Sequence, residues 1–422
     1  MTGFRRLFLY PAAFVRTTHS GQAEGRRTPL YDFHLAQNAK LINFCGYSLP
    51  IQYNSQSIID SHNHVRRRCG VFDVSHMLQV RVFGSDRIHF METLTTADLA
   101  ELPAGSGTLS VYLNDRGGIL DDVIINVCKE PYLYVVSNAA CAEKITNLLK
   151  EKREHFTKLG RDVQLDFMTD RALLAVQGPE AHETIKKGIT ATERTTFEDI
   201  YFMETALFSS IFGLKADGLP IRITRCGYTG EDGYEIKVPA ELSVDLANWL
   251  TVFTNVKPVG LAARDTLRLE AGMCLYGNDL FEERTPVESS LGWLIGKRRR
   301  SSPSQRPFPG SELVLNQLNN PRTLTHKRIG LASNLGPPAR TGAKLYVQGE
   351  TTPIGEVTSG CYSPTLRRNI AMAYVKPDFA NPGQQLHAEI REKHFPFIVT
   401  ALPFVPNRFV RRPTKRDSVR VA

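Results

Sequence analysis

Several features that would assign this 422-residue chain to a well-defined class are missing from it. No stretch approaches the ~18 consecutive apolar residues that a membrane-spanning helix needs, so we expect no membrane insertion. The seven cysteines include no CxxC pair, and a chain of this length needs no disulfides to hold a core, so we expect reduced thiols. A Walker A sequence is also lacking, which argues against a P-loop nucleotide site.

A recognisable metal site is missing as well. His62, His64 and Cys69 come nearest to one, but no fourth ligand follows at a familiar spacing. We therefore expect no bound metal.

The formal net charge of +9 comes from the two ends of the chain. Residues 1–27 carry a net +4 and residues 408–422 a net +5, so the body between them is neutral. A neutral body argues against nucleic-acid binding, which needs a basic face. Within the body, the local run 297–300 (KRRR) is expected to be a solvated loop, with an acidic partner as the alternative.

The first 27 residues have the composition of a targeting segment. They are rich in Arg, Ser and Thr, contain one acid, Glu24, and include a short apolar patch at 7–10 that ends at Pro11. A mitochondrial transit peptide has this composition, whereas a secretory signal needs a longer apolar core. We therefore predict a transit peptide over 1–27 and a mitochondrial matrix location.

The pattern from residue 30 to about 287 mixes helical stretches with strands of alternating polarity, which favours an α+β fold. Residues 260–272 predict a helix with a glycine at its end, on which Arg264 and Arg268 share a face. The glycine cluster at 227–233 runs into a predicted strand at 234–238. A dinucleotide loop would instead open a helix, so a Rossmann domain is excluded.

The last quarter of the chain reads as a separate domain. Residues 300–310 are dense in Ser, Pro and Arg and predict a linker. Short β-prone runs at 344–347, 354–358 and 370–375 then recur between glycine and proline turns, which indicates a small antiparallel barrel. We expect a body over 28–299, the linker over 300–310, the barrel domain over 311–408 and a basic tail over 409–422.

Two acids stand at the start of the predicted strand within residues 117–127. Successive side chains of a strand face opposite ways, so Asp121 and Asp122 are not expected to share one site. Both faces of this strand are apolar, so at least one carboxylate should be partly buried, where a charge is costly without a partner. The plainer alternative is a carboxylate at a turn or strand edge.

Three further residues are candidates on weaker grounds. Glu235 in the predicted strand and Arg264 on the predicted helix are, taken singly, expected to be solvated surface groups. Trp293, one of two tryptophans, predicts either core packing or an aromatic wall for a flat ligand.

Ordered motifs run through the chain outside its two ends and the linker. They are TPLYDFH (28–34), GVFDVSHM (70–77), GGILDD (117–122), LYVVSNA (133–139), LLAVQGP (173–179), TRCGYTGEDGYE (224–235), GLAARDTLRLEAGMCLYGND (260–279), TPVESSLGW (285–293), IGEVTSG (354–360), SPTL (363–366) and IAMAYV (370–375). Together they resemble the aminomethyltransferases, or T-proteins, of the glycine cleavage system.

The resemblance implies a three-domain, cloverleaf-like body that binds tetrahydrofolate, its co-substrate, in a central channel. It also implies a reaction. The aminomethyl group carried on the lipoyl arm of H-protein gives its methylene to tetrahydrofolate, ammonia is released, and the reduced arm remains.

The resemblance also implies roles for individual residues. The second acid of GGILDD, here Asp122, is the catalytic one in that family, and an ionised carboxylate beside the pterin can stabilise positive charge on the reacting nitrogen. Glu235 and Arg264 match folate contacts, although which end of folate each one holds stays open. Other positions near the ligand are matched by Met77, Tyr134, Val136, Asn138 and Trp293.

One position departs from the family pattern. A tyrosine that contacts folate usually follows the PFVP segment (403–406), and here Phe409 takes its place. The ring is kept and the hydroxyl is lost, which costs about 0.5 to 1.5 kcal/mol if the hydrogen bond is not replaced.

Two other families of folate-binding proteins fit the sequence less well. A non-enzymatic folate-binding factor of iron–sulfur cluster assembly typically shows a KGCYxGQE motif, but this chain has CGYTGEDGYE together with the complete GGILDD. The folate domain of a sarcosine or dimethylglycine dehydrogenase would need an attached flavin domain, for which the chain shows no pattern.

Overall fold

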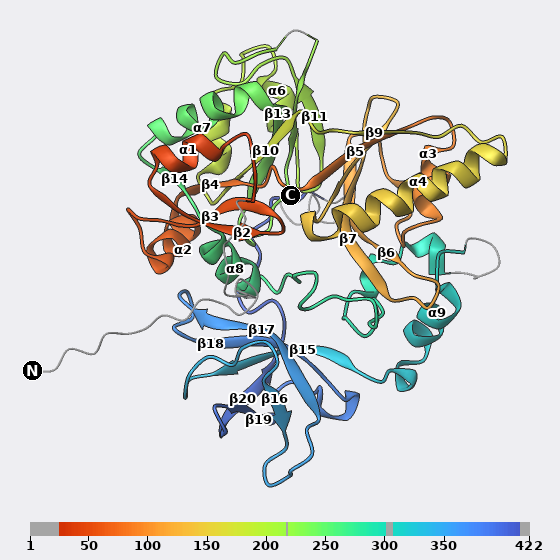
Figure 1. Cartoon of the computed structure of the whole chain (residues 1–422), viewed down its shortest axis with the longest axis vertical. Helices are drawn as coiled ribbons and strands as arrows, with labels where there is room; N and C mark the ends of the chain where they lie inside the picture. The colour runs from red at the N-terminus through yellow and green to blue at the C-terminus, as the bar shows by residue number, and fades with distance from the viewer. Residues whose placement is uncertain (1–24, 217, 301–306, 414–422) are drawn as a thin grey trace, which may run out of the picture.

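The computed structural model describes residues 25–216, 218–300 and 307–413. Figure 1 shows three lobes of mixed helices and sheets arranged around a common centre, which confirms the predicted α+β, cloverleaf-like body. The predicted transit peptide lies outside the described residues except for 25–27, and the predicted linker and basic tail are described only in part. No helix within the described residues is long and apolar enough to cross a membrane.

The first lobe is built on a six-stranded sheet in the order β11-β12-β13-β10-β4-β14, beside a small sheet in the order β1-β3-β2. Its core is a cluster of buried aliphatic and aromatic side chains, including Leu174, Ile236 and Phe208. The strands are β1 (Arg26–Arg27), β2 (Ala39–Phe44), β3 (Tyr47–Tyr53), β4 (Cys69–Asp73), β10 (Arg171–Gln177), β11 (Thr205–Phe208), β12 (Ile221–Thr224), β13 (Gly233–Pro239) and β14 (Val256–Pro258). The helices are α1 (Tyr31–Ala36), α2 (Ile58–Arg67), α5 (Ala181–Lys186), α6 (Arg194–Glu198), η4 (Ala240–Leu242), α7 (Ser243–Val252) and α8 (Leu261–Glu270).

The second lobe is a five-stranded antiparallel sheet in the order β6-β7-β8-β5-β9, with its own core. The long helix α4 (Ala142–Lys158) buries Ile145, Leu149 and Phe156, so a period near 3.6 residues places its apolar face against the sheet. The other elements are β5 (Leu78–Phe83), α3 (Arg87–Glu92), η2 (Leu99–Glu101), β6 (Ser106–Leu113), β7 (Ile119–Val127), β8 (Leu133–Ser137), η3 (Ala139–Cys141) and β9 (Gln164–Phe167).

The third lobe is a closed barrel in the order β15-β18-β17-β16-β19-β20, as the β-prone runs predict. Closure leaves a sheet without edges, so every strand finds partners on both sides. The strands are β15 (Lys327–Ser333), β16 (Lys344–Tyr346), β17 (Gly355–Ser363), β18 (Arg368–Val375), β19 (Gln385–Ile390) and β20 (Lys393–Thr400), with η8 (Pro377–Phe379) between β18 and β19. The barrel is reached through η5 (Gly292–Leu294), η6 (Lys297–Arg300), α9 (Ser311–Asn319) and η7 (Pro321–Thr323).

The prediction of a solvated loop at 297–300 is wrong. Arg299 is buried and donates to the carbonyl oxygens of Ala97 and Glu92 at 2.7 and 2.6 Å. Arg298 forms ion pairs with Glu92 and Asp98. Because a guanidinium carries five donors in a fixed fork, such a run can tie one segment to another as well as interact with water.

Helix α8 joins the first lobe to the barrel, because it packs against α2 and β3 on one side and β17 and β18 on the other. The predicted helix over 260–272 is confirmed: α8 spans Leu261–Glu270, and Gly272 adopts the left-handed conformation that ends many helices. Helix α2 begins with a capping box in which Ser57 and Asp60 satisfy each other's backbone N–H groups.

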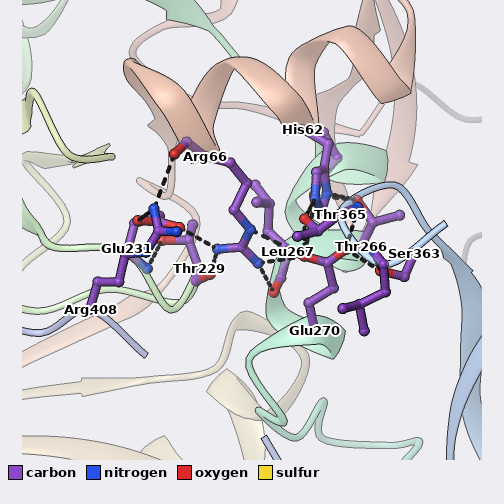
Figure 2. Close-up of polar contacts among 12 residues, drawn as sticks. His62, Arg66, Thr229, Glu231, Thr266, Leu267, Glu270, Ser363, Thr365 and Arg408 are labelled. Carbon is purple, nitrogen blue, oxygen red and sulfur yellow. Dashed lines mark hydrogen bonds and ion pairs between the residues drawn. The ribbon is translucent and has the colours of Figure 1, made fainter. Parts of the chain in front are cut away.

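A buried group of polar side chains, which we call the clasp, holds this junction together (Figure 2). At its centre the Glu270 carboxylate accepts hydrogen bonds from Arg66 at 2.9 and 3.1 Å and from the hydroxyl and backbone N–H of Thr365. Arg66 in turn donates to Glu231 at 2.9 Å. Members of the clasp come from α2, the glycine cluster at 227–233, α8 and the barrel. They are His62, Arg66, Glu231, Glu270, Ser363 and Thr365.

Candidate active site

A cavity of about 1090 Å³ lies where the three lobes meet. Its walls come from β7 and β8 of the second lobe, from β13 and α8 of the first, and from the barrel with the segment that follows it. Eight of the nine residues singled out from the sequence lie on its wall, namely Met77, Asp122, Val136, Asn138, Glu235, Arg264, Trp293 and Phe409.

The GGILDD segment shows why its two glycines are needed. Gly117 has a φ of +74°, which side chains rarely tolerate, and a Cβ on Gly118 would lie 1.8 Å from the backbone oxygen of Glu282. The tight turn therefore leads directly into β7. As a result, Asp121 and Asp122 sit at the beginning of the strand, and Asp122 lies on the cavity wall.

Asp121 and Asp122 face opposite ways, as expected of successive residues in a strand, and only Asp122 lies on the cavity wall, but one residue that was not expected to do so binds both. The side-chain amide of Asn138 donates to an oxygen of each carboxylate, at 2.8 Å in both cases, and the backbone N–H of Asn138 donates to Asp121 at 3.0 Å. The alternation of the strand is kept, since Asp121 is fully buried and Asp122 half-buried. Asn138 follows directly after the neighbouring strand β8, so its amide can reach past the end of β7 to both acids.

Both carboxyl groups are in an environment that disfavours their charge. Burial and the neighbouring Asp122 raise the pKa of Asp121. Burial also raises the pKa of Asp122, partly offset by the hydrogen bond from Asn138. Two carboxylates that share one amide donor repel each other, so the pair holds a proton more readily than either acid would in water.

Glu235 and Arg264 are not the solvated surface groups expected of them singly. Both are half-buried on the cavity wall. Burial raises the pKa of Glu235, opposed by the charge of Arg264 and a hydrogen bond from the Cys226 thiol. The Arg264 guanidinium lies 4.9 Å from the ring centroid of Tyr228, and its buried Nη1 finds no hydrogen-bond partner among the described residues.

His76 is a cavity residue that sequence reasoning missed. It lies 4% exposed on the wall, and its Nδ1 has no hydrogen-bond partner within the described parts of the chain. Burial lowers the pKa of this imidazole to about 4, so it is neutral at pH 7. Its place in the GVFDVSHM motif, next to Met77, was the available signal.

Tyr134 lies behind the cavity instead of on its wall. Its hydroxyl donates to Gln79 at 2.8 Å, and its ring faces a small void of about 10 Å³. This void shares Ile124, Val136, Cys226 and Glu235 with the large cavity. A contact between Tyr134 and a ligand therefore stays a prediction, and the structure favours an indirect role through these shared residues.

Two aromatic residues face the cavity from different segments. Trp293 is 63% exposed, which rules out core packing and leaves the alternative of an aromatic wall. Phe409 stacks on Phe202 with a centroid distance of 4.0 Å and an interplanar angle of 9°. Flat apolar walls of this kind suit a ligand that contains planar rings.

The three residues considered as metal ligands have other partners. His62 belongs to the clasp, His64 bonds the carbonyl oxygen of Asn255 at 2.9 Å, and Cys69 is a buried free thiol. Within the described ranges, no three His, Cys, Asp or Glu side chains are grouped so as to hold a metal ion. The absence of a metal nevertheless stays a prediction.

The cavity thus combines the Asp122 carboxyl group on one wall, with Asp121 buried behind it, and the Glu235 carboxylate, an unpaired guanidinium donor and a neutral imidazole on the others. Carboxylates at this depth can bind amino or ring N–H groups, and the guanidinium can bind a carbonyl or carboxylate oxygen. This arrangement suits a planar, nitrogen-rich molecule with polar edges, and it places an acid–base pair beside it.

Comparisons with known proteins agree with this geometry. The profile described as "GCVT N-terminal domain" matches residues 30–299, and the profile described as "Glycine cleavage T-protein C-terminal barrel domain" matches residues 326–406. The human protein named "Aminomethyltransferase, mitochondrial" is 46% identical over 407 residues, covering 96% of both chains. The Dictyostelium discoideum protein of the same name is 40% identical, covering 92% of this chain and 95% of that one.

A solved structure gives the same result for the fold. The crystal structure of glycine cleavage system aminomethyltransferase T from Bartonella henselae superposes with a TM-score of 0.81 and 34% sequence identity, covering 92% of this chain and 99% of that one. Relatives at this identity over nearly the whole chain leave no ambiguity: the chain belongs to the aminomethyltransferase (T-protein) family of the glycine cleavage system.

Proposed function

We propose that this chain is the tetrahydrofolate-dependent aminomethyltransferase of the glycine cleavage system, acting in mitochondria. One observation carries the proposal: a chain of this family brings Asp122, Glu235 and Arg264, from three different elements, to the wall of one large cavity. The mitochondrial location rests on relatives that are named mitochondrial and on the composition of residues 1–27.

The reaction joins two substrates at one carbon. A folate nitrogen attacks the methylene of the aminomethyl group on the lipoyl arm of H-protein, and the bond to ammonia breaks. The second folate nitrogen attacks the same carbon, and the carbon–sulfur bond breaks. The protons lost from the two nitrogens end on ammonia and on the sulfur, which gives methylenetetrahydrofolate and the dihydrolipoyl arm.

Asp122 is proposed to act on the attacking nitrogen. It faces the cavity, and its charge is held by a single amide of Asn138. A carboxylate in so dry a place stabilises a developing ammonium strongly, because little solvent screens the interaction. Asn138 is proposed to orient the carboxylate.

The folate itself is proposed to be held by the remaining wall. Glu235 suits the donor edge of the pterin, since a carboxylate accepts two hydrogen bonds side by side, and Arg264 offers an unpaired donor to an oxygen. Met77, Val136 and Trp293 would form apolar or stacking walls. We propose no role for a metal.

The iron–sulfur assembly alternative has no support from the comparisons, because the matching profiles are named for GCVT and the glycine cleavage T-protein and the relatives above are named aminomethyltransferases. A direct test uses protein lacking residues 1–27 with aminomethyl-loaded H-protein and tetrahydrofolate. We expect ammonia release and methylenetetrahydrofolate formation, and at least a tenfold loss in Asp122→Asn, about 1.4 kcal/mol of transition-state stabilisation.

Asp115→Asn is the matched control, because it removes an exposed carboxylate from the turn that precedes the same strand. Its activity should equal that of the parent. Folate binding without turnover in the parent would refute the proposed function, whereas equal activity in Asp122→Asn and the parent would remove Asp122 from the chemistry.

A further inference from the structure

The segment after the barrel, residues 407–412, returns to the cavity with alternate side chains turned in opposite directions. Asn407, Phe409 and Arg411 lie on the cavity wall. Arg408 and Arg412, which alternate with them, pair with acids elsewhere in the first lobe. This alternation is what an extended backbone produces, so the segment presents one face to the cavity.

The segment is held in place at several points. The backbone N–H of Arg408 donates to Gly230 at 2.7 Å, and the carbonyl of Val410 accepts from Phe202 at 2.8 Å. Arg412 binds Glu204 at 2.8 Å and Asp199 at 3.1 Å, and this contact lowers the pKa of Glu204. The side chain of Arg411 is therefore presented from an anchored backbone.

Arg411 differs from the two neighbouring arginines in its partners. Arg408 pairs with Glu231 and Arg412 with two acids, but within the described residues no carboxylate pairs with Arg411. The guanidinium carbon of Arg411 instead lies 5.0 Å from the ring centroid of Phe202. Phe202 also stacks on Phe409, so the two rings form a flat apolar wall. The Arg411 guanidinium lies at the end of this wall, and its N–H donors are available to a ligand.

This arrangement matches one end of the proposed substrate. Beyond its pterin, folate has a benzoyl ring and then a glutamyl group with carboxylates. We propose that Phe202, Phe409 and Arg411 form a subsite at the cavity rim in which the two rings pack beside the benzoyl group and Arg411 binds the glutamyl carboxylates. The inference rests on the proposed function, and it directs the pterin toward Asp122 and Glu235.

The subsite predicts a preference for folates with longer glutamyl chains. Arg411 is exposed, so further carboxylates can approach it from solvent without losing their hydration. Each added glutamate brings another negative charge within a Debye length of the guanidinium at low salt. Affinity should therefore rise with chain length and fall as salt is added.

The test compares tetrahydrofolate with one and with five glutamates as substrates for the parent, Arg411→Gln and Arg322→Gln. Arg322 is an exposed arginine outside the cavity wall, so its variant controls for the loss of one positive charge. We expect Arg411→Gln to raise the KM for the pentaglutamate by about three- to tenfold and the KM for the monoglutamate by less, with kcat unchanged. Arg322→Gln should have the same KM and kcat as the parent with both substrates.

Salt gives a second readout. The parent's preference for the pentaglutamate should shrink between about 0.01 and 1 M ionic strength, where the Debye length falls from about 30 to about 3 Å, and Arg411→Gln should show little of this dependence. Equal rises in KM for both substrates, or none, would overturn the subsite. Absence of turnover by the parent with either folate would refute the proposed function, and titration calorimetry with the pentaglutamate would then still test Arg411.

Discussion

Two buried groups of charged side chains, the clasp and the charged residues of the cavity wall, both include a residue of helix α8. They differ in whether their charges have partners within the protein. In the clasp, Glu270 at the end of α8 accepts hydrogen bonds from Arg66, Ser363 and Thr365. Against the effect of burial, its pKa is lowered to about 2, first by His62 and then by Arg66 and Ser363. On the cavity wall, Arg264 of the same helix has an unpaired donor, and burial raises the pKa of Glu235.

The difference separates charges that hold the fold from charges kept for a ligand. A buried charge whose partners all lie in the protein has its desolvation penalty offset by those partners, and removing one of them is strongly destabilising. A buried charge without partners destabilises the empty protein, and a ligand that supplies the partners recovers that free energy on binding. The sign of the pKa shift distinguishes the two groups here, although both are buried.

The largest expected effect comes from breaking the clasp. Glu270→Gln removes one of the two carboxylate partners of Arg66, the other being Glu231, and removes the carboxylate that His62 contacts. We expect it to lower the free energy of unfolding by about 3 to 5 kcal/mol. Urea denaturation monitored by circular dichroism measures this change. Glu356→Gln, which removes the exposed barrel partner of Lys344, should cost less than about 1 kcal/mol, and a similar loss in both variants would end the distinction.

Glu235→Gln should keep the stability of the protein and weaken folate binding. It removes a charge that the empty cavity disfavours, so we expect the stability to stay within about 1 kcal/mol of the parent or to rise. Folate affinity should nevertheless fall at least tenfold, because an amide accepts fewer hydrogen bonds than a carboxylate, and titration calorimetry can measure this. A loss of stability comparable to that of Glu270→Gln would contradict the comparison.

The dependence of stability on pH should have opposite signs in the two groups. The folded-state pKa of Glu270 is depressed from 4.5 to about 2, so its stabilisation is present above 4.5 and is lost as the pH falls toward 2. The folded-state pKa of Glu235 is raised above 4.5, so its ionisation destabilises the protein as the pH rises past 4.5.

Urea midpoints of the parent and both variants between pH 3 and 7 would show these signs. The deficit of Glu270→Gln should shrink at the acid end, and the relative advantage of Glu235→Gln should grow toward neutral pH. Each group can contribute at most about 1.4 kcal/mol per pH unit. If the urea midpoints of the two variants, relative to the parent, changed with pH in the same direction, the pKa shifts of Glu270 and Glu235 would not differ in sign.

The smallest expected effect is at Phe409. Phe409→Tyr restores the hydroxyl usual in the family, and one hydrogen bond to folate would lower the KM by about two- to tenfold, corresponding to about 0.5 to 1.5 kcal/mol. Its stability should match that of the parent, since the ring can keep its stacking on Phe202. An unchanged KM would mean that the hydroxyl does not reach the ligand in this chain.

The parts that followed local patterns could be predicted from the sequence. The helix at 260–272, the strand that follows the glycine cluster and the C-terminal barrel depend on periodicity and turn residues that lie close together in the chain. The roles of the cavity residues came from the family resemblance. Local patterns indicated only a partly buried acid at 121–122 and an aromatic wall as one alternative for Trp293, and they predicted surface positions for Glu235 and Arg264.

What could not be predicted depends on partners far apart in sequence. Asn138 binds Asp121 and Asp122 across two strands, and the burial of Arg299 depends on carbonyl oxygens about 200 residues away. The burial of Glu270 could not be predicted, because nothing in the sequence of its helix indicates that barrel hydroxyl groups donate to its carboxylate. Long-range hydrogen bonds leave no periodicity, so single-sequence reasoning does not find them.

The distribution of the cavity wall along the chain also has a consequence for folding. Arg264 and Phe409 face the same cavity but are about 145 residues apart, so a chain that has folded only its first two lobes has two cavity walls and lacks the third. Folate, which stabilises only the form that binds it, therefore cannot protect the protein until the barrel and the segment after it have folded.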